Sequence, residues 1–176
     1  MANFPTIVVT TEAQLNSAIN AVNTGAVGAY VISIVSPILL NAPLLAISVA
    51  AGSSLVIQGN GNVVDGSGTQ RGFVVQSGRV TLENLSIENM LAHGGDAGGD
   101  GGGGGGLGSG LVVGSAASVT VSNVVFNHDS AMGGAGGGGV SASPATGSNA
   151  GATGGAGSNG GLLGILVGGG GGGTGG

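Results

Sequence analysis

The residues of this chain that could do chemistry are few and mostly acidic. The sequence has seven Asp and Glu residues, two histidines, two basic residues and no cysteine. The densest group is His93, Asp96 and Asp100, whose imidazole and carboxylate groups are competent metal ligands. These three residues also stand at the start of a glycine-rich segment, where solvated side chains on a loop are the simpler interpretation. We therefore predict no metal and no cofactor, and keep these three residues as the metal candidates.

Polysaccharide cleavage is the catalytic alternative. A lyase needs carboxylates that gather calcium and a basic residue that abstracts a proton, and an inverting hydrolase needs two carboxylates at a fixed separation. Arg71 and Arg79 are the only basic residues, and no motif surrounds them. No predicted strand carries a carboxylate cluster, so the sequence predicts a protein that is not an enzyme. The alternative is a carbohydrate-active enzyme whose site is assembled from Asp65, Glu83 and Glu88.

Charge and composition exclude several partners. The net charge is −5 and no charged residue lies between Glu12 and Asp65. A chain without a basic patch lacks the electrostatic footprint of a nucleic-acid or anionic-membrane binder. The apolar stretch 30–51 is interrupted by prolines and an asparagine, so it is too broken for a membrane-spanning helix of about 20 residues. Long uncharged segments rich in Val, Ile and Leu are typical of strands buried in a stack.

An internal repeat positions most of the apolar residues. The segment 72–93 aligns with 110–132, so that Asn84 meets Asn123. A weaker copy comes earlier, where Leu55–Ile57 aligns with Val80–Leu82. The spacing is 25 residues and then 39, and the extra length of the second interval is a glycine-rich insertion. Self-similarity at such a period indicates stacked structural units, here of three short strands each.

Alternation within the strands predicts which side chains point inward. Thr81 and Thr120 should stack on the outside, which raises an ice-binding protein as a further alternative. Asn84 and Asn123 should occupy equivalent turns, where each amide can bind local backbone and its counterpart. The predicted inward residues are Val80, Leu82, Leu85 and Ile87 in one copy and Val119, Val121, Val124 and Phe126 in the next.

One helix is predicted before the strands. Thr11 has Gln14 three residues later, which is the spacing of a capping box. Leu15, Ile19 and Val22 follow at helical spacing and make one apolar stripe from about residue 12 to residue 22. A single amphipathic helix ahead of many strands can cover the open end of their core.

Two glycine-rich segments, 94–110 and 133–161, follow the third strand of successive copies. Insertions in repeat proteins collect on one face, so these segments should lie side by side at one corner. Flexible loops are the default expectation for glycine. The competing interpretation is ordered packing of extended chains of the polyproline II type, although no strict three-residue spacing is present. Residues 162–167 resemble the start of a further copy.

The three-strand repeat, the paired asparagines and the helix followed by Val31-Ile32-Ser33-Ile34 resemble the right-handed parallel β-helix of the pectate-lyase-like kind. More narrowly, 55–61 and 80–89 are similar to bacterial autotransporter passengers and glycine-rich β-helical adhesins. The resemblance covers residues 7 to 132. It implies an all-β, right-handed single-stranded parallel β-helix with three short strands per coil, an N-terminal capping α-helix and glycine-rich insertions at one corner. The units would be 1–25, 26–132 with the insertion 94–110, and 133–176.

The function predicted from these features is a non-catalytic structural or adhesive module at the bacterial cell surface or outside the cell. Self-association is expected through the open C-terminal coil or the glycine-rich segments, giving oligomers or filaments. A glycan or a cell-surface ligand is a possible partner. This functional prediction rests largely on the resemblance, since one fold of this kind carries many activities.

Overall fold

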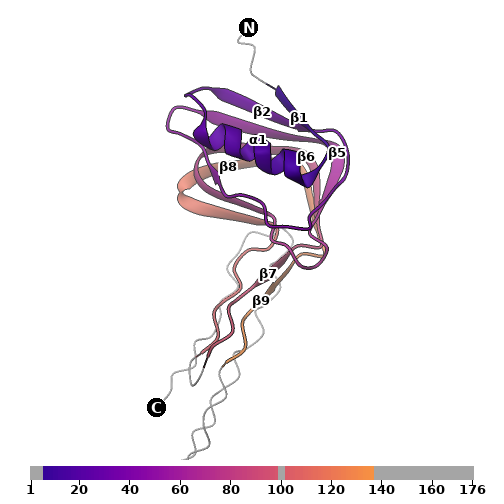
Figure 1. The fold of residues 1–176 in the computed structure, drawn as a ribbon, viewed down its shortest axis with the longest axis vertical. Helices are drawn as coiled ribbons and strands as arrows, with labels where there is room; N and C mark the ends of the chain where they lie inside the picture. The colour runs from indigo at the N-terminus through magenta and orange to yellow at the C-terminus, as the bar shows by residue number, and fades with distance from the viewer. Residues whose placement is uncertain (1–5, 99–101, 137–176) are drawn as a thin grey trace, which may run out of the picture.

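The computed structural model describes residues 6–98 and 102–136, which form a sheet portion and a stalk of extended chain (Figure 1). One helix lies among nine strands in the described residues. The stalk contains β7 and β9, and the sheet portion contains the other elements. Their bounds are β1 Thr6–Val9, α1 Glu12–Thr24, β2 Ala29–Ile34, β3 Ile38–Leu39, β4 Ile47–Ser48, β5 Ser54–Asp65, β6 Phe73–Glu88, β7 Leu91–His93, β8 Leu111–Asn127 and β9 Ser130–Met132.

Every described strand pairing is parallel. Seven strands make one sheet in the order β1-β2-β5-β6-β4, with β3 on β5 and β8 on β6, and β7 pairs with β9 in a second sheet. Val31 lies beside Val56, Val56 beside Thr81, and Thr81 beside Thr120. These offsets of 25, 25 and 39 residues are the spacings expected from the repeat.

The predicted fold class, an all-β right-handed parallel β-helix of three short strands per coil, is wrong. The seven strands form one open sheet in which β1 and β4 end the path of paired strands. The strands are not divided as predicted, since β5, β6 and β8 span 12, 16 and 17 residues. The physical reason is visible at Asn84 and Asn123, which have φ of 51°. A left-handed residue bends a strand, and here the ladder resumes at the next residue pair, so the predicted turn does not end the strand.

The register predicted from the repeat is confirmed. Val80 pairs with Val119, Leu82 with Val121, Leu85 with Val124 and Ile87 with Phe126. The four residues of β6 are at most 2% exposed, whereas their partners in β8 are only partly buried against the same core. The inward direction was therefore predicted correctly in both copies, but full burial is reached in only one of them.

The helix α1 covers one end of this core, as its apolar stripe predicts. Leu15, Ala18, Ile19 and Val22 are buried, and α1 contacts β1, β2 and β4. Thr11 is the N-cap and its hydroxyl accepts a hydrogen bond from the backbone N–H of Gln14 at 3.3 Å. The reciprocal contact differs from a capping box, because the Gln14 side chain accepts from the N–H of Thr10 at 2.8 Å.

Polar side chains of α1 also fasten the connection that leads to β4. Asn23 accepts from the N–H of Ser48 and donates to the carbonyl of Ala46, both at 2.8 Å. Glu12 accepts from the N–H of Asn41 at 2.7 Å. These bonds satisfy backbone groups of a segment that forms little regular structure and so has few backbone partners of its own. No helix in the described residues is long and apolar enough to cross a membrane.

Candidate functional site

The outer edge of β8, which we call the β8 edge, is the most extended uncovered feature of the described residues. β8 spans Leu111–Asn127 and pairs with β6 along one side. No described strand pairs with its other side. Its sequence, LVVGSAASVTVSNVVFN, contains no charged residue and no proline. A long neutral edge offers a row of backbone donors and acceptors to another strand.

The inward side chains of β8 leave apolar surface at the same end. Val119, Val121, Val124 and Phe126 are packed against the core yet only partly buried. On the opposite face of the strand, Val125 is 57% exposed. Because the inward side chains extend the fully buried row of β6, the core ends at them without a cover among the described residues.

The two turn asparagines contact each other as predicted. The Nδ2 of Asn123 donates to the Oδ1 of Asn84 at 2.8 Å. Both residues bend their strands at positive φ, which Asn tolerates better than other non-glycine residues. The Asn123 side chain is exposed at the β8 edge, so the row of amides also ends there.

Three passes of glycine-rich chain pack together in the stalk, and we call residues 94–98, 102–106 and 133–136 the glycine stack. Gly94 N donates to Met132 O and Ala97 N to Ala135 O, both at 2.9 Å. The middle pass links the outer two, because Gly104 N donates to Gly95 O at 2.7 Å and Gly134 N to Gly104 O at 2.8 Å. The first and last passes therefore advance together by three residues per bond (94 to 97, and 132 to 135).

The interior of the glycine stack has no room for side chains. A Cβ on Gly94 would overlap the carbonyl oxygen of Gly104, one on Gly103 that of Gly134, and one on Gly106 that of Met132. At Gly98, by contrast, a Cβ would meet nothing within 4 Å. The three-residue step, from Gly103 to Gly106 and from Gly94 to Ala97, matches an extended chain with three residues per turn. The described part of the glycine-rich segments thus adopts the packed alternative and not the loop.

The metal candidates are not gathered into a site. The Oδ1 of Asp96 accepts from the N–H of Ala135 at 2.7 Å, which fastens two passes of the glycine stack to each other. His93 is exposed at the end of β7, and Asp100 lies outside the described residues. Within those residues, no group of three or more His, Asp or Glu side chains could hold a metal ion.

The carboxylates considered for catalysis lie on neighbouring strands but are engaged elsewhere. Asp65 and Glu88 are register partners. The Oδ1 of Asp65 accepts from the N–H of Ser67 at 2.7 Å. Glu83 lies beside Gln58 and accepts from its Nε2 at 2.9 Å. Asp65 is thus bound to its own turn, and Glu83 to a polar side chain of the neighbouring strand.

Within 6–98 and 102–136, Asp129 is the one titratable group whose pKa is strongly shifted, and no sequence motif singled it out. Its Oδ1 accepts from the N–H of Met90 at 2.9 Å, while its Oδ2 is buried without a hydrogen-bond partner among the described residues. Burial raises the pKa of Asp129 to about 6, with a smaller contribution from Glu88. The Met90 N–H and His128 oppose that rise. Burial of Asp129 and the N–H of Met90 together create this environment. The two residues are 39 positions apart, so no local motif could indicate it.

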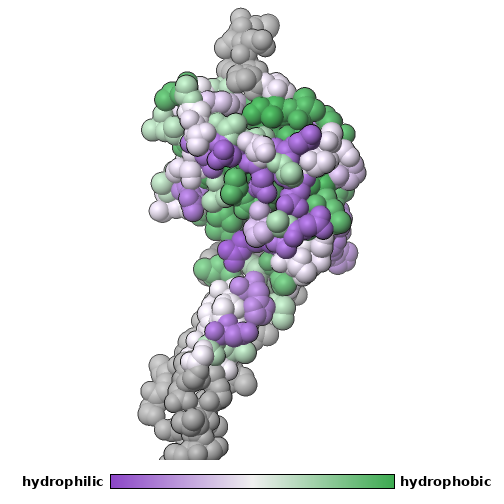
Figure 2. Space-filling view, viewed as in Figure 1, coloured by the Kyte–Doolittle hydropathy of each residue, from purple (hydrophilic) through white to green (hydrophobic). Residues whose placement is uncertain are grey.

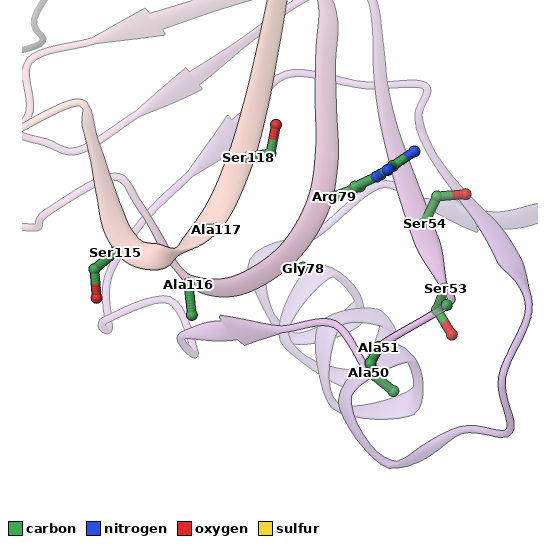
Figure 3. A pocket seen from close by; sticks show the side chains of 11 residues that line it. Ala50, Ala51, Ser53, Ser54, Gly78, Arg79, Ser115, Ala116, Ala117 and Ser118 are labelled. Carbon is green, nitrogen blue, oxygen red and sulfur yellow. The ribbon is translucent and has the colours of Figure 1, made fainter.

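A pocket of about 670 Å³ lies where β6 and β8 bend, and Arg79 is its only charged lining residue (Figure 3). β8 carries one extra residue here, because Val75 pairs with Val113 but Ser77 pairs with Ala116. The bulge separates β8 from the turn that precedes β5, and the pocket lies between them. Its walls are Ala50, Ala51, Gly52, Ser53, Ser54, Gly78, Arg79, Ser115, Ala116, Ala117 and Ser118.

Comparison with known proteins adds no assignment to these features. No protein-family model, no curated protein and no solved structure matches the chain. The similarity to autotransporter passengers and adhesins therefore stays a prediction from the sequence.

Proposed function

We propose that this protein is a non-catalytic structural module of the cell surface or extracellular space that self-associates through the β8 edge. The observation that carries the proposal is the coincidence, at one end of the sheet, of 17 residues of unpaired neutral strand and a half-buried apolar row. Either feature alone is common. Together they require both backbone partners and apolar cover, which a second strand supplies at once.

Protection of the edge is absent along the described strand. Edges that must stay free usually carry lysine, proline or inward-pointing charge. β8 has none of these between Leu111 and Asn127. Its register shifts at the bulge near Ala116 and the strand bends at Asn123, but the ladder from Ser118 to Ser122 is regular. The regular part holds Val119 and Val121, so the unprotected backbone and the apolar row occupy the same stretch.

A second copy of this chain is the partner that suits this edge. The edge carries no charge that would select an oppositely charged partner. Two copies related by a two-fold axis would bring the same neutral surface together, and their β8 strands would run antiparallel. The opposite end of the core is covered by α1, and its outermost strand β1 has four residues. Pairing of one β8 edge with another is therefore favoured over head-to-tail stacking.

Sedimentation velocity across a concentration series tests the proposal. We expect the wild-type chain to shift from monomer to dimer as concentration rises. Val124→Lys should return it to monomer, because a charge in the apolar row must be desolvated on pairing. Thr81→Lys is the matched control, since it adds the same charge on β6, one strand inside the edge. Circular dichroism must show that both variants keep the strand signal.

Three results would overturn the proposal. A wild-type chain that stays monomeric at high concentration shows that the edge is covered by the chain itself or needs no cover. Equal dissociation by Val124→Lys and Thr81→Lys shows that charge acts without regard to position. Release of new reducing or unsaturated ends from polysaccharides by the purified chain would show that it is an enzyme.

A further inference from the structure

The pocket beside Arg79 contains a positive charge with no counter-ion among the described residues. The chain has only two basic residues against seven acidic ones, so an unpaired arginine is unexpected. Six of the seven carboxylates lie in the described range, and each accepts a hydrogen bond from a group other than arginine. The donors are Asn41 N to Glu12, Ser67 N to Asp65, Gln58 Nε2 to Glu83, Ser86 Oγ to Glu88, Ala135 N to Asp96 and Met90 N to Asp129.

Hydroxyl groups flank this charge on the two neighbouring strands. Ser54 pairs with Arg79 across β5 and β6, and Arg79 pairs with Ser118 across β6 and β8. Register partners on adjacent strands lie about 5 Å apart. In Figure 3 the Arg79 side chain extends from β6 toward β5, on the side where the Ser54 hydroxyl also projects. Arg79 is exposed, so its guanidinium is available to a ligand, and Ser54 and Ser118 supply hydroxyls on the strands to either side.

The walls of the pocket leave space for a ligand larger than an ion. Alanine, glycine and serine are its only lining residues apart from Arg79, and the volume of about 670 Å³ is that of a small-molecule site. No acidic side chain lines it to repel an anion. The bulged stretch of β8 forms one wall of the space, since its extra residue changes the register with β6 at the bend.

We infer that this pocket binds a small carboxylate-bearing, polyhydroxylated molecule, with Arg79 holding the carboxylate and Ser54 and Ser118 the adjacent hydroxyls. Arginine binds a carboxylate through two parallel hydrogen bonds, which makes it the selective element. The serine hydroxyls both donate and accept, as ligand hydroxyls require. This assignment rests on the bend of the strands and not on the proposed self-association, but Ser118 lies on the β8 edge, so binding must also be measured in a chain that does not self-associate.

Titration with gluconate, followed by backbone amide chemical shifts, tests the assignment. We expect saturable shifts confined to 50–54, 78–79 and 115–118. Arg79→Gln should weaken binding at least about tenfold, the effect of losing a charge-assisted hydrogen bond. Arg71→Gln is the matched control, because Arg71 does not line the pocket. The same titration in the Val124→Lys variant keeps the result independent of self-association.

Two further probes separate the groups that are recognised. Sorbitol has the hydroxyls of gluconate without its carboxylate and should bind at least about tenfold more weakly. Hexanoate has a carboxylate without hydroxyls and should lose a smaller factor. The inference is overturned if gluconate causes no saturable shift, if Arg79→Gln and Arg71→Gln bind it equally, or if sorbitol binds as well as gluconate.

Discussion

The two ends of the sheet portion bury the same kinds of residue to different extents. At one end, α1 lies across the core (Figure 1), and its own side chains Leu15 and Ile19 are fully buried against the sheet. At the other end, Val119 and Val121 in β8 continue the rows of Val80 and Leu82 but are only partly buried. The residue types are nearly identical, so the difference lies in the cover. A completed end contributes stability, and an incomplete end remains available for another chain.

Polar contacts repeat this contrast. Side chains of α1 bind the backbone from Asn41 to Ser48, so the covered end has its connections satisfied. At the β8 edge, Asn123 donates inward to Asn84 and has no described partner on its outer side. In Figure 2, polar and apolar residues are interspersed over the visible face of the sheet portion, and the described part of the stalk shows weakly polar residues with a few strongly hydrophilic ones. The interaction surface is therefore distinguished by strand geometry and not by a dominant charged patch.

Removing the cover should have the largest effect. We expect Leu15→Ala to lower the free energy of unfolding by about 2–5 kcal/mol, because the side chain is fully buried and the rigid sheet beneath it cannot close the cavity. Urea unfolding followed by circular dichroism measures this change. A loss below about 1 kcal/mol would mean that α1 is held by its polar contacts and contributes little through burial.

A matched pair of substitutions measures the two ends within one register row. Val80→Ala removes a side chain that is 1% exposed, and Val119→Ala removes its partly buried partner in β8. We expect losses of about 2 and about 1 kcal/mol respectively in the free energy of unfolding, in proportion to the apolar area and packing removed. The experiment is done at a concentration where the chain is monomeric. Equal losses would show that the β8 end is covered in solution.

The sequence predicted those features that depend on local spacing. Thr11 as N-cap, the stripe of α1 and the pairing of Asn84 with Asn123 all follow from residue types at short intervals or from the repeat. The continuation of β6 and β8 through these asparagines could not be predicted from the sequence. Asn at positive φ can end a strand or bend it, and only the hydrogen bonds of the next pair show that β6 and β8 continue. The β-helix was predicted because Asn84 and Asn123 were expected to end their strands in turns, whereas in the structure they bend strands that continue.

The remaining features depend on segments distant in the sequence. The middle pass of the glycine stack, 102–106, is all glycine, so its three-residue period cannot be recognised until the facing chains are known. The pocket requires a bulge in β8, and the environment of Asp129 requires the N–H of Met90 from another strand connection. The repeat shows where these positions recur, since the offset changes from 38 residues at Phe73 to 39 at Val80, but it does not show a pocket or a buried carboxylate there.

The glycine stack extends the comparison of filled and open positions to single residues. Gly103→Ala adds a methyl group where the carbonyl oxygen of Gly134 lies, whereas at Gly98 the same position is empty. We expect Gly103→Ala to separate the three passes and Gly98→Ala to leave them intact. Hydrogen exchange of the Gly104 and Gly134 amides measures this, with protection falling at least about tenfold in the first variant only. Equal protection in both variants would show that the chains do not pack in solution.

The smallest effect is expected from substitution of Asp129. This residue lies at the β8 end of the sheet portion, and Met90 occupies the equivalent position one strand closer to the core. The offset of 39 residues that relates β6 to β8 places the two at equivalent positions, and Met90 is 1% exposed. The folded chain holds a proton on Asp129 up to about pH 6, whereas a fully solvated Asp has a pKa of 3.8. The folded state then binds the proton more tightly than the unfolded state, so the contribution of Asp129 to stability is greatest below pH 3.8 and is lost as pH rises through about 6.

Asp129→Asn should remove this dependence while keeping the acceptor for the Met90 N–H. Urea unfolding of both chains at several pH values measures it, and the advantage of the variant should increase between pH 3.8 and about 6 and then stay constant. A parallel pH profile for the two chains would mean that the buried Oδ2 reaches solvent, and that the β8 end is more open than its partly buried apolar row indicates.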